Sequence, residues 1–343
     1  MSRSDRLLKA CRLEPADCTP VWFMRQAGRY MKAYREIREK NSLGEMFKNP
    51  EIAARVTLQP VDAFEVDAAI IFADILLPLE GMGLNLDFAP GPVIANPVRT
   101  PTDVRNLRIS DPDADLGYIL KSLEWVRAEL NGRVPLIGFA GAPFTLASYA
   151  IEGGSSSGYL LTKSFMYNHK PDWDLLMQKL GSTIAAFLKA QFGSGAQLVQ
   201  LFDSWAGCLS PSDYRDYVLP HTQRIFRELK EAGIPSIHFG TGTAGLLPLM
   251  GEAGGDVVGV DWRIRLDDAW ERIPSGAGIQ GNLDPAMLLT AQWHELGGRA
   301  AEILDMARGR SGHIFNLGHG ILPSTPEDSV KALTDFVHEC SNG

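Results

Sequence analysis

Eight short apolar runs recur along the 343-residue chain, and stretches with helical patterns separate them. The runs lack the apolar–polar alternation of a strand with one face in water, so each indicates a strand buried on both faces. Strand–helix alternation repeated eight times favours an α/β protein that forms a single closed (β/α)8 barrel, the TIM-barrel architecture, over an open doubly wound sheet. We predict strands at residues 21–24, 68–73, 134–139, 197–202, 235–239, 256–260, 277–280 and 313–317.

No linker or low-complexity tract marks a domain boundary, so we expect residues 1–343 to form one domain. The irregular stretch is residues 81–101, where glycines and prolines, Pro90 among them, separate short alternating pieces. We expect this stretch to be an excursion, with a hairpin, over the end of the second strand. A flexible loop is expected at Gly153-Gly154-Ser155-Ser156-Ser157-Gly158.

Helix signals fill the gaps between the strands. Asn49-Pro50-Glu51 combines an N-cap residue, a proline for the first helical position and an acid, which predicts a helix start. Ser210-Pro211 and Thr325-Pro326 predict two more starts, and Pro220 should bend or break the helix that contains it. Further helices are expected at about residues 4–12, 29–40, 116–130, 159–168 and 172–192.

Polar or glycine-rich residues follow nearly every predicted strand. In a (β/α)8 barrel the active site lies at the carboxyl ends of the strands, so these residues predict one large site built from many strands. The residues at these positions are Arg25, Asp74, Gly141, Asp203, Asp261, Asn282 and His319.

An arginine cluster follows the first strand, with Arg25, Arg29 and Arg35 in quick succession and Gly28 at a turn. Guanidinium groups are always charged, and their planar fork matches a carboxylate or phosphate. The chain has 33 basic and 41 acidic side chains, a net charge of −8, which argues against nucleic acid or anionic membrane as a partner. We therefore expect Arg25 to bind a specific anion, and Arg35 to pair with acids such as Glu36 or Glu39.

Asp74 closes the most apolar run, so it is either an internal ion-pair partner or a catalytic group. Beside Arg25 its carboxylate should stay ionised and stabilise a nearby cation. Gly240-Thr241-Gly242-Thr243-Ala244-Gly245 matches a dinucleotide-binding pattern. Its place at the fifth strand favours a tight turn at the barrel mouth instead.

Other chemistries find little support in the sequence. The seven histidines do not cluster at metal-ligand spacing, and no base stands beside Ser204 to activate it as a nucleophile. The four cysteines form no C-x-x-C pair, which predicts free thiols in a reducing compartment. No signal-peptide pattern and no apolar run of membrane-spanning length occur, so we expect a soluble cytoplasmic protein.

The longer motifs, taken in order, closely resemble the uroporphyrinogen decarboxylase family. They are W-F-M-R-Q-A-G-R-Y-M at 22–31, I-I-F-A-D-I-L at 70–76, G-F-A-G-A-P-F-T-L-A-S-Y at 138–149, Q-L-F-D-S-W-A-G at 200–207, H-F-G-T-G at 238–242, G-V-D-W-R at 259–263, G-N-L-D-P at 281–285 and N-L-G-H-G-I-L-P at 316–323.

The resemblance implies a homodimeric barrel that needs no cofactor and no metal. It implies conversion of the four acetate side chains of uroporphyrinogen III to methyls, with release of carbon dioxide, to give coproporphyrinogen III in haem synthesis. It also implies that substrate contacts fall on Arg25, Gln26, Ala27, Gly28, Arg29, Asp74, Tyr149, Ser204 and His319.

This substrate suits the residues. Its many carboxylates account for an arginine cluster on an acidic protein, and its pyrrole N–H groups can donate to one central carboxylate. We expect Asp74 to stabilise a protonated pyrrole cation, while Arg25, Arg29 and His319 position carboxylates. Either Arg25 or His319 delivers the proton.

Two other functions are compatible with a barrel of this kind. Corrinoid-dependent methyltransferases resemble this barrel, but they hold zinc through H-x-C and a later cysteine, whereas here the tripeptide is His238-Phe239-Gly240 and His319 stands in the later position. The other rival is a barrel that binds tetrapyrroles or other anions without catalysis.

Overall fold

The computed structural model of the chain describes residues 3–88, 91–290 and 292–341. Within these residues seven strands form one sheet in the order β1-β4-β5-β6-β7-β8-β9. All neighbouring pairs are parallel, so the strands' carboxyl ends meet at one edge. The strands are β1 Ala69–Ile70, β4 Leu136–Gly141, β5 Leu198–Asp203, β6 Ser236–Gly240, β7 Val257–Gly259, β8 Gly278–Leu283 and β9 His313–Leu317.

An irregular segment, residues 20–24, fills the eighth position and closes the ring between β9 and β1. Val21 forms an isolated parallel bridge to Phe315, whose N–H donates to the Pro20 carbonyl at 2.9 Å. On the other side the Asp67 N–H donates to the Val21 carbonyl at 2.7 Å. The (β/α)8 barrel is therefore confirmed. The predicted regular strand over 21–24 is wrong, because Pro20 has no N–H to donate and the N–H groups of Val21 and Met24 donate to side chains instead of to a neighbouring strand.

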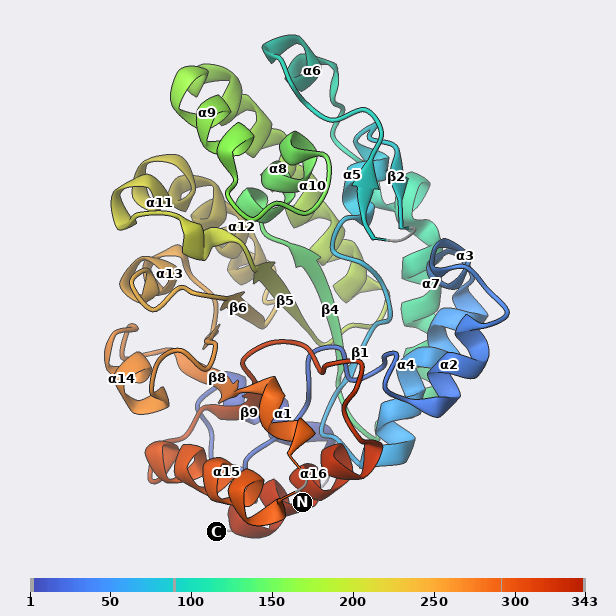
Figure 1. Ribbon diagram of the computed structural model, residues 1–343, viewed down its shortest axis with the longest axis vertical. Coiled ribbons are helices and arrows are strands. Elements are labelled where there is room, and N and C mark those ends of the chain that lie inside the picture. The colour runs from blue at the N-terminus through green and yellow to red at the C-terminus, as the bar shows by residue number, and fades with distance from the viewer. Residues whose placement is uncertain (1–2, 89–90, 291, 342–343) are drawn as a thin grey trace.

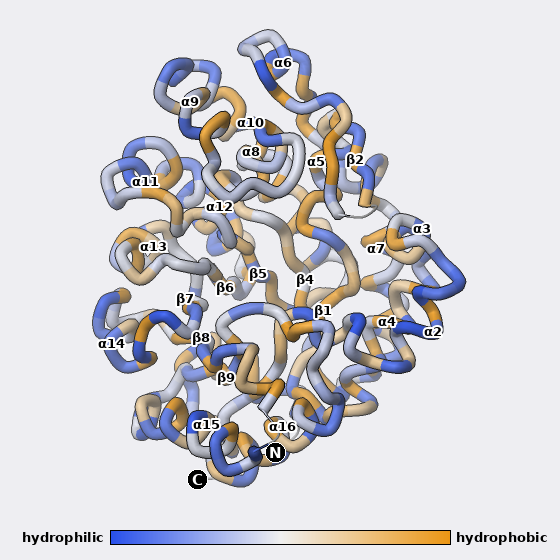
Figure 2. Tube along the Cα trace, viewed as in Figure 1, coloured by the Kyte–Doolittle hydropathy of each residue, from blue (hydrophilic) through white to orange (hydrophobic). Residues whose placement is uncertain are grey.

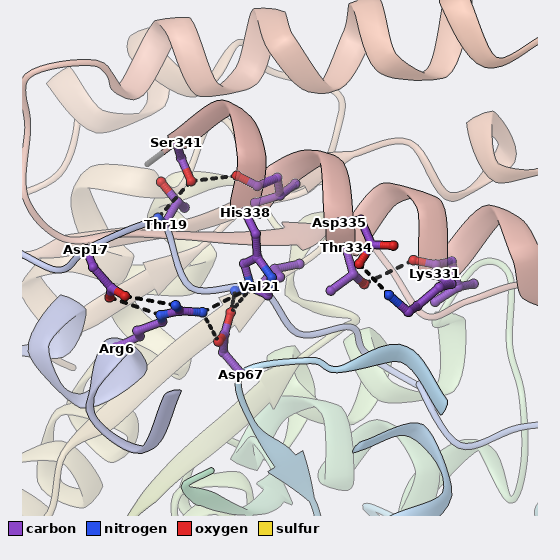
Figure 3. A network of polar contacts seen from close by, with 12 residues as sticks. Arg6, Asp17, Thr19, Val21, Asp67, Lys331, Thr334, Asp335, His338 and Ser341 are labelled. Carbon is purple, nitrogen blue, oxygen red and sulfur yellow. Dashed lines mark hydrogen bonds and ion pairs between the residues drawn. The ribbon is translucent and has the colours of Figure 1, made fainter. Parts of the chain in front are cut away.

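The Asp67 carboxylate is the centre of a polar network that holds this closure together, shown in Figure 3. Its side chain is fully buried and accepts hydrogen bonds from the Val21 N–H (2.8 Å) and Arg6 Nη1 (3.0 Å). His338 Nε2 lies 2.6 Å from Asp67 Oδ2, the same oxygen that accepts from the Val21 N–H. Arg6 is held in turn by both carboxylate oxygens of Asp17. One carboxylate thus joins the first helix, the closing segment and the last helix.

Helix α1 (Arg3–Cys11) closes the amino-terminal end of the barrel. Its Leu7, Ala10 and Cys11 pack in the same apolar cluster as interior residues of the strands, such as Ile237 and Ile314. Higher in the interior, Trp22 Nε1 donates to Gln280 Oε1, and Gln280 Nε2 donates to Gln200 Oε1, both at 3.0 Å. The interior between the strands is therefore a packed core. Pockets lie at both of its ends, one beside Thr19, Pro20 and His313 at the amino ends of the strands and one at their carboxyl ends.

Helices surround the strands (Figure 1), and hydrophilic segments lie mostly at the periphery (Figure 2). They are α2 Lys32–Arg38, α3 Leu43–Lys48, α4 Pro50–Phe64, α5 Leu77–Gly81, α6 Pro101–Asn106, α7 Pro112–Leu130, α8 Pro143–Glu152, α9 Leu160–Asn168, α10 Lys170–Gly193, α11 Pro211–Tyr217, α12 Leu219–Glu231, α13 Leu247–Ala253, α14 Leu266–Glu271, α15 Trp293–Ala307 and α16 Glu327–Ser341, with short 3-10 turns η1 Ala206–Cys208 and η2 Pro285–Leu289. No helix of the described ranges is long and apolar enough to cross a membrane.

The helix signals are largely confirmed. Asn49 caps α4, with its side-chain oxygen accepting from the N–H groups of Glu51 and Ile52. The break near Pro220 falls at Val218, between α11 and α12, because proline fits the first turn of α12 and needs no N–H partner there. Helix α2 begins only at Lys32, three residues later than predicted, since turns occupy the residues before it.

The excursion contains the expected hairpin. Strands β2 (Leu86–Asp87) and β3 (Val93–Ile94) pair antiparallel, while Pro90 lies outside the described residues. The hairpin also contacts the end of α8, where the Ile94 N–H donates to the Gly153 carbonyl at 2.9 Å. The hairpin is therefore fixed to the loop that follows α8.

Candidate active site

Arg25 stands at the mouth of the barrel in a left-handed conformation, with φ +58°. Its neighbour Met24 is fixed on both sides: the Met24 N–H donates to Asn316 Oδ1 (3.2 Å), and its carbonyl accepts from the Ile321 N–H (2.9 Å). The Arg25 stem packs on Gly320, where a Cβ would lie only 2.4 Å from Arg25 Cδ. A rare backbone conformation imposed on an exposed arginine is typical of a functional position.

Asp74 follows β1 and lies within the electrostatic reach of Arg25. Its Oδ1 accepts from the Leu76 N–H at 2.9 Å. Burial raises the pKa of Asp74 above its ordinary value, while the Leu76 N–H and the Arg25 charge oppose that rise. The Arg25 charge thus favours the ionised carboxylate, as expected, while the loss of water opposes it. That Asp74 acts in its ionised form stays a prediction.

Tyr149, on α8, faces the same space. Its ring stacks on Trp205 with centroids 3.8 Å apart. Burial, then the charge of Asp74, raises the pKa of the Tyr149 hydroxyl to about 12, and Arg25 opposes the shift. The hydroxyl is therefore protonated near neutral pH and available as a hydrogen-bond donor.

His319 and Ser204 line one pocket of about 640 Å³ at the mouth. Burial, followed by the charges of Arg25 and Arg263, lowers the pKa of His319 to about 4, so the imidazole is neutral near pH 7. The hydroxyl of Thr241 donates to the Ser204 carbonyl and ties this turn to the end of β6. Of the predicted site residues, His319 and Ser204 line this pocket, and Arg25 lies within electrostatic reach of His319, Asp74 and Tyr149.

The other residues of the R-Q-A-G-R segment, 26–29, differ in how far they are exposed. Gln26 is buried, and its side chain bonds the Phe23 N–H (3.2 Å) and the Ala68 carbonyl (3.0 Å). Arg29 is exposed, while Ala27 and Gly28 are half-buried. That Gln26, Ala27, Gly28 and Arg29 contact a substrate stays a prediction.

The predicted ion pair of Arg35 with Glu36 or Glu39 is wrong. Its Nη1 donates to the main-chain carbonyls of Arg29 (2.9 Å) and Tyr30 (2.6 Å). Arg35 thereby braces the turn that carries Arg29. Among the residues that the structure describes, neither Arg25 nor Arg29 has a carboxylate within ion-pair distance.

Three polar residues that close strands serve the scaffold instead of facing the mouth. Asp203 is fully buried, accepts from Thr145 Oγ1 at 3.1 Å and lies 3.8 Å from His238 Nε2. Asp261 accepts from the Gly242 N–H at 2.6 Å, which makes the glycine-rich stretch a fixed turn. Asn282 Nδ2 donates to the carbonyls of Asp261 and Ile264. Their shared position at strand ends did not distinguish them from Asp74.

His238 is fully buried among helices, with Nδ1 3.3 Å from the Met250 carbonyl on α13 and its ring beside Phe226 on α12. It is thus separated from the pocket that His319 lines. No group of three His, Cys, Asp or Glu side chains that could hold a metal ion occurs within the described ranges.

Several residues of the pocket escaped the sequence analysis. Trp205, Tyr159, Trp262 and Arg263 line it together with Ser204 and His319. Arg263 lies two residues beyond the end-of-strand position that drew attention to Asp261. The signal that could have found it is its place, as a cation, in a loop after a strand.

The fold and this site define an α/β barrel with two arginines, Arg25 and Arg263, at its mouth. A family model described as uroporphyrinogen decarboxylase (URO-D) matches residues 2–340. A uroporphyrinogen decarboxylase of Roseiflexus sp. (strain RS-1) is 55% identical over 343 residues, covering 98% of each chain. One from Chloroflexus aurantiacus (strain ATCC 29366 / DSM 635 / J-10-fl) is 56% identical over 339 residues, covering 97% of this chain and 95% of the relative. The chain belongs to the uroporphyrinogen decarboxylase family, which places it among the carboxy-lyases.

A solved methyltransferase from Methanosarcina mazei shares the fold, with a TM-score of 0.83 over 99% of both chains and 21% identity. At that identity the likeness concerns the barrel alone. It gives the methyltransferase reading no support beyond the shared architecture.

Proposed function

We propose that this chain converts uroporphyrinogen III to coproporphyrinogen III in porphyrin and haem biosynthesis by removing carbon dioxide from the four acetate side chains. The observation that carries the proposal, together with family membership, is Arg25 beside Asp74, with no carboxylate of the described residues paired to it. A multiply charged carboxylate substrate would supply that partner. The pyrrole N–H groups at its centre would donate to Asp74.

In the proposed reaction a proton first adds to the pyrrole ring that carries the acetate. The C–C bond to the carboxylate then breaks, carbon dioxide leaves, and the bond's electron pair neutralises the ring cation as an exocyclic methylene. Protonation of that methylene and loss of the ring proton give the methyl group. One proton is consumed and one carbon dioxide is released for each acetate.

Asp74 would stabilise the cationic intermediate. Burial raises its pKa, which means that its ionised form is poorly solvated in the free protein. An incoming ring cation with N–H donors would satisfy that carboxylate, and the gain would be larger with the cation than with the neutral substrate. Preferential binding of the cation is what lowers the barrier.

The other groups would bind and orient. The lowered pKa of His319, about 4, favours hydrogen bonding by a neutral imidazole over proton donation. We therefore assign the proton-delivering position to Arg25, while Arg29, Tyr149, Ser204 and His319 contact the substrate. Gln26, Ala27 and Gly28 would contribute through the main chain that shapes the turn. No added metal or organic cofactor enters these steps.

The test is an anaerobic assay of chelator-treated protein with uroporphyrinogen III, after which the products are oxidised and separated by carboxylate count. Stepwise loss of four carboxylates without added cofactor supports the proposal. Asp74→Asn should lower kcat about 10²–10³-fold, as removal of one preorganised stabilising group does, with an unchanged circular dichroism spectrum. Asp87→Asn, on the exposed hairpin, is the matched control.

Near-normal turnover by Asp74→Asn would contradict the role of this carboxylate. Binding without turnover by the unmodified protein would favour a non-catalytic anion-binding barrel. Zinc-dependent transfer of a methyl group from a methylcorrinoid to a thiol, with no loss of carboxylates from uroporphyrinogen III, would favour the methyltransferase alternative.

We further propose one barrel domain that forms a cytoplasmic homodimer, with no nucleic-acid or membrane partner. The free thiols of all four cysteines support a reducing compartment, and the net charge of −8 supports the absence of polyanionic partners. For the dimer, the support is the apolar surface of α9, where Leu160 is 77% and Leu161 47% exposed. Sedimentation equilibrium should give twice the monomer mass, and Leu160→Glu should shift the protein toward monomer.

A further inference from the structure

Arg263 lies on the loop between β7 and α14 and lines the same pocket as Ser204 and His319. Its side chain is 54% exposed, so a bound molecule can reach its guanidinium group. Arg263 ends the G-V-D-W-R motif at 259–263, but neither the resemblance nor the strand-end pattern gave it a role. Its position nevertheless puts a second permanent cation at the mouth.

The guanidinium of Arg263 is held in a defined position. One nitrogen, Nη1, donates to Asp261 Oδ2 at 2.5 Å, and the group lies over the Trp262 ring, 4.1 Å from its centroid. The Asp261 carboxylate is shared, since it also accepts from the N–H groups of Gly242 and Arg263. No described residue other than Asp261 accepts from the Arg263 side chain, which leaves Nε and Nη2 as donors.

Arg25 and Arg263 flank His319 on its two sides. Gly318 abuts the Trp262 main chain, where a Cβ would lie 2.5 Å from the Trp262 nitrogen, and Gly320 abuts the stem of Arg25. The charges of both arginines reach the His319 imidazole and lower its pKa. A ligand over His319 would therefore meet guanidinium groups from two directions.

We infer that Arg263, stacked on Trp262, binds a peripheral carboxylate of the substrate on the side of His319 away from Arg25. The inference rests on the proposed function and deepens it. A ligand with a single carboxylate needs only one guanidinium, whereas two separated cations with one neutral donor between them suit a ligand with acid groups around its rim. Arg263 thus serves substrate binding and leaves the reacting ring to Asp74.

The alternative is that Arg263 only fastens its loop through Asp261. Loop fastening and substrate binding predict different changes. Loss of a loop contact would lower stability or kcat, because Asp261 also holds the Gly242 turn. Loss of a substrate contact would raise KM and the Kd for the ligand and leave kcat and stability in place.

The experiment compares Arg263→Gln with Arg265→Gln. Arg265 is on the same loop, is 60% exposed, bonds both oxygens of Asp267 and does not line the pocket. With uroporphyrinogen III, Arg263→Gln should raise KM about tenfold, the usual effect of losing one charged hydrogen bond, with kcat within about twofold. Arg265→Gln should match the unmodified protein.

A second readout needs no turnover. Uroporphyrin III, the oxidised octacarboxylate, should quench tryptophan fluorescence, and its Kd should rise about tenfold for Arg263→Gln. Equal KM and Kd values in the two variants would overturn the inference, as would a loss of kcat and thermal stability without a change in Kd. Absence of turnover in the unmodified protein would instead refute the proposed function, while the uroporphyrin titration would still decide whether Arg263 binds carboxylates.

Discussion

The closure of the barrel depends on the Asp67 carboxylate, and its replacement should destabilise the protein by a measurable amount. Asp67 is fully buried and faces three donors, the Val21 N–H, Arg6 Nη1 and His338 Nε2. In Asp67→Asn the amide has one remaining acceptor, and its NH₂ group faces at least one other donor. With its oxygen at the Oδ2 position the amide loses the charge-assisted bond from Arg6, and with its oxygen at the Oδ1 position it loses the bonds from Val21 and His338; in either case the NH₂ group faces a donor.

The magnitude follows from the partners. Hydrogen bonds to charged groups contribute about 1.5–3 kcal/mol each. Arg6 keeps its two bonds to Asp17, which limits the loss. We therefore predict that Asp67→Asn lowers the free energy of unfolding by about 3 kcal/mol, and Asp67→Ala by about 3–5 kcal/mol, since the Ala variant removes every acceptor.

The assay is urea unfolding followed by tryptophan fluorescence and circular dichroism. With a slope of about 3 kcal/mol/M, the Asp67→Asn midpoint should lie about 1 M below that of the unmodified protein. The control is Asp62→Asn, whose exposed ion pair with Arg133 should contribute less than about 1 kcal/mol. Amide exchange at Val21 should accelerate in the Asp67 variant. Equal midpoints for Asp67→Asn and Asp62→Asn would refute the role assigned to this carboxylate.

Two further predictions concern the buried hydrogen bonds of Thr145 near the site and the pH dependence of stability. Thr145→Val should lower the free energy of unfolding by about 3 kcal/mol, because buried Asp203 loses the donor at its Oδ1 and the Trp205 N–H loses its acceptor. Thr145→Ser keeps the hydroxyl, so its urea midpoint should stay near that of the unmodified protein. Equal midpoints for the Val and Ser variants would contradict this prediction. The pKa of His319, about 4 when folded, lies below its ordinary 6.5, so between these values the unfolded chain binds more protons and stability falls as the pH drops from about 6.5 to about 4. Burial also lowers the pKa of His313 to about 4, and this group acts in the same direction. His319→Gln should therefore remove only part of the difference in urea midpoint between pH 7 and pH 5. An unchanged difference would contradict the lowered pKa of His319.

The strand positions and helix starts could be predicted because they depend on local patterns. An apolar run indicates a buried strand, and a cap such as Asn49-Pro50 indicates a helix start, because each pattern lies within a few residues of the element that it marks. The segment 20–24 looked like the other strands because it is equally apolar. Its hydrogen bonds go to Asp67 and Asn316, residues distant in sequence, so only the folded chain reveals that it is not a regular strand.

The same distinction holds for the site. The sequence by itself determined that polar residues follow buried strands and that their ends share one face, which sufficed to select Arg25, Asp74 and His319 as candidates. Only the tertiary structure decided that Asp203 turns toward the helices while Arg263 lines the pocket. The direction of a side chain at a strand end depends on strand register and on the loops packed beside it, and neither is a local property of the sequence.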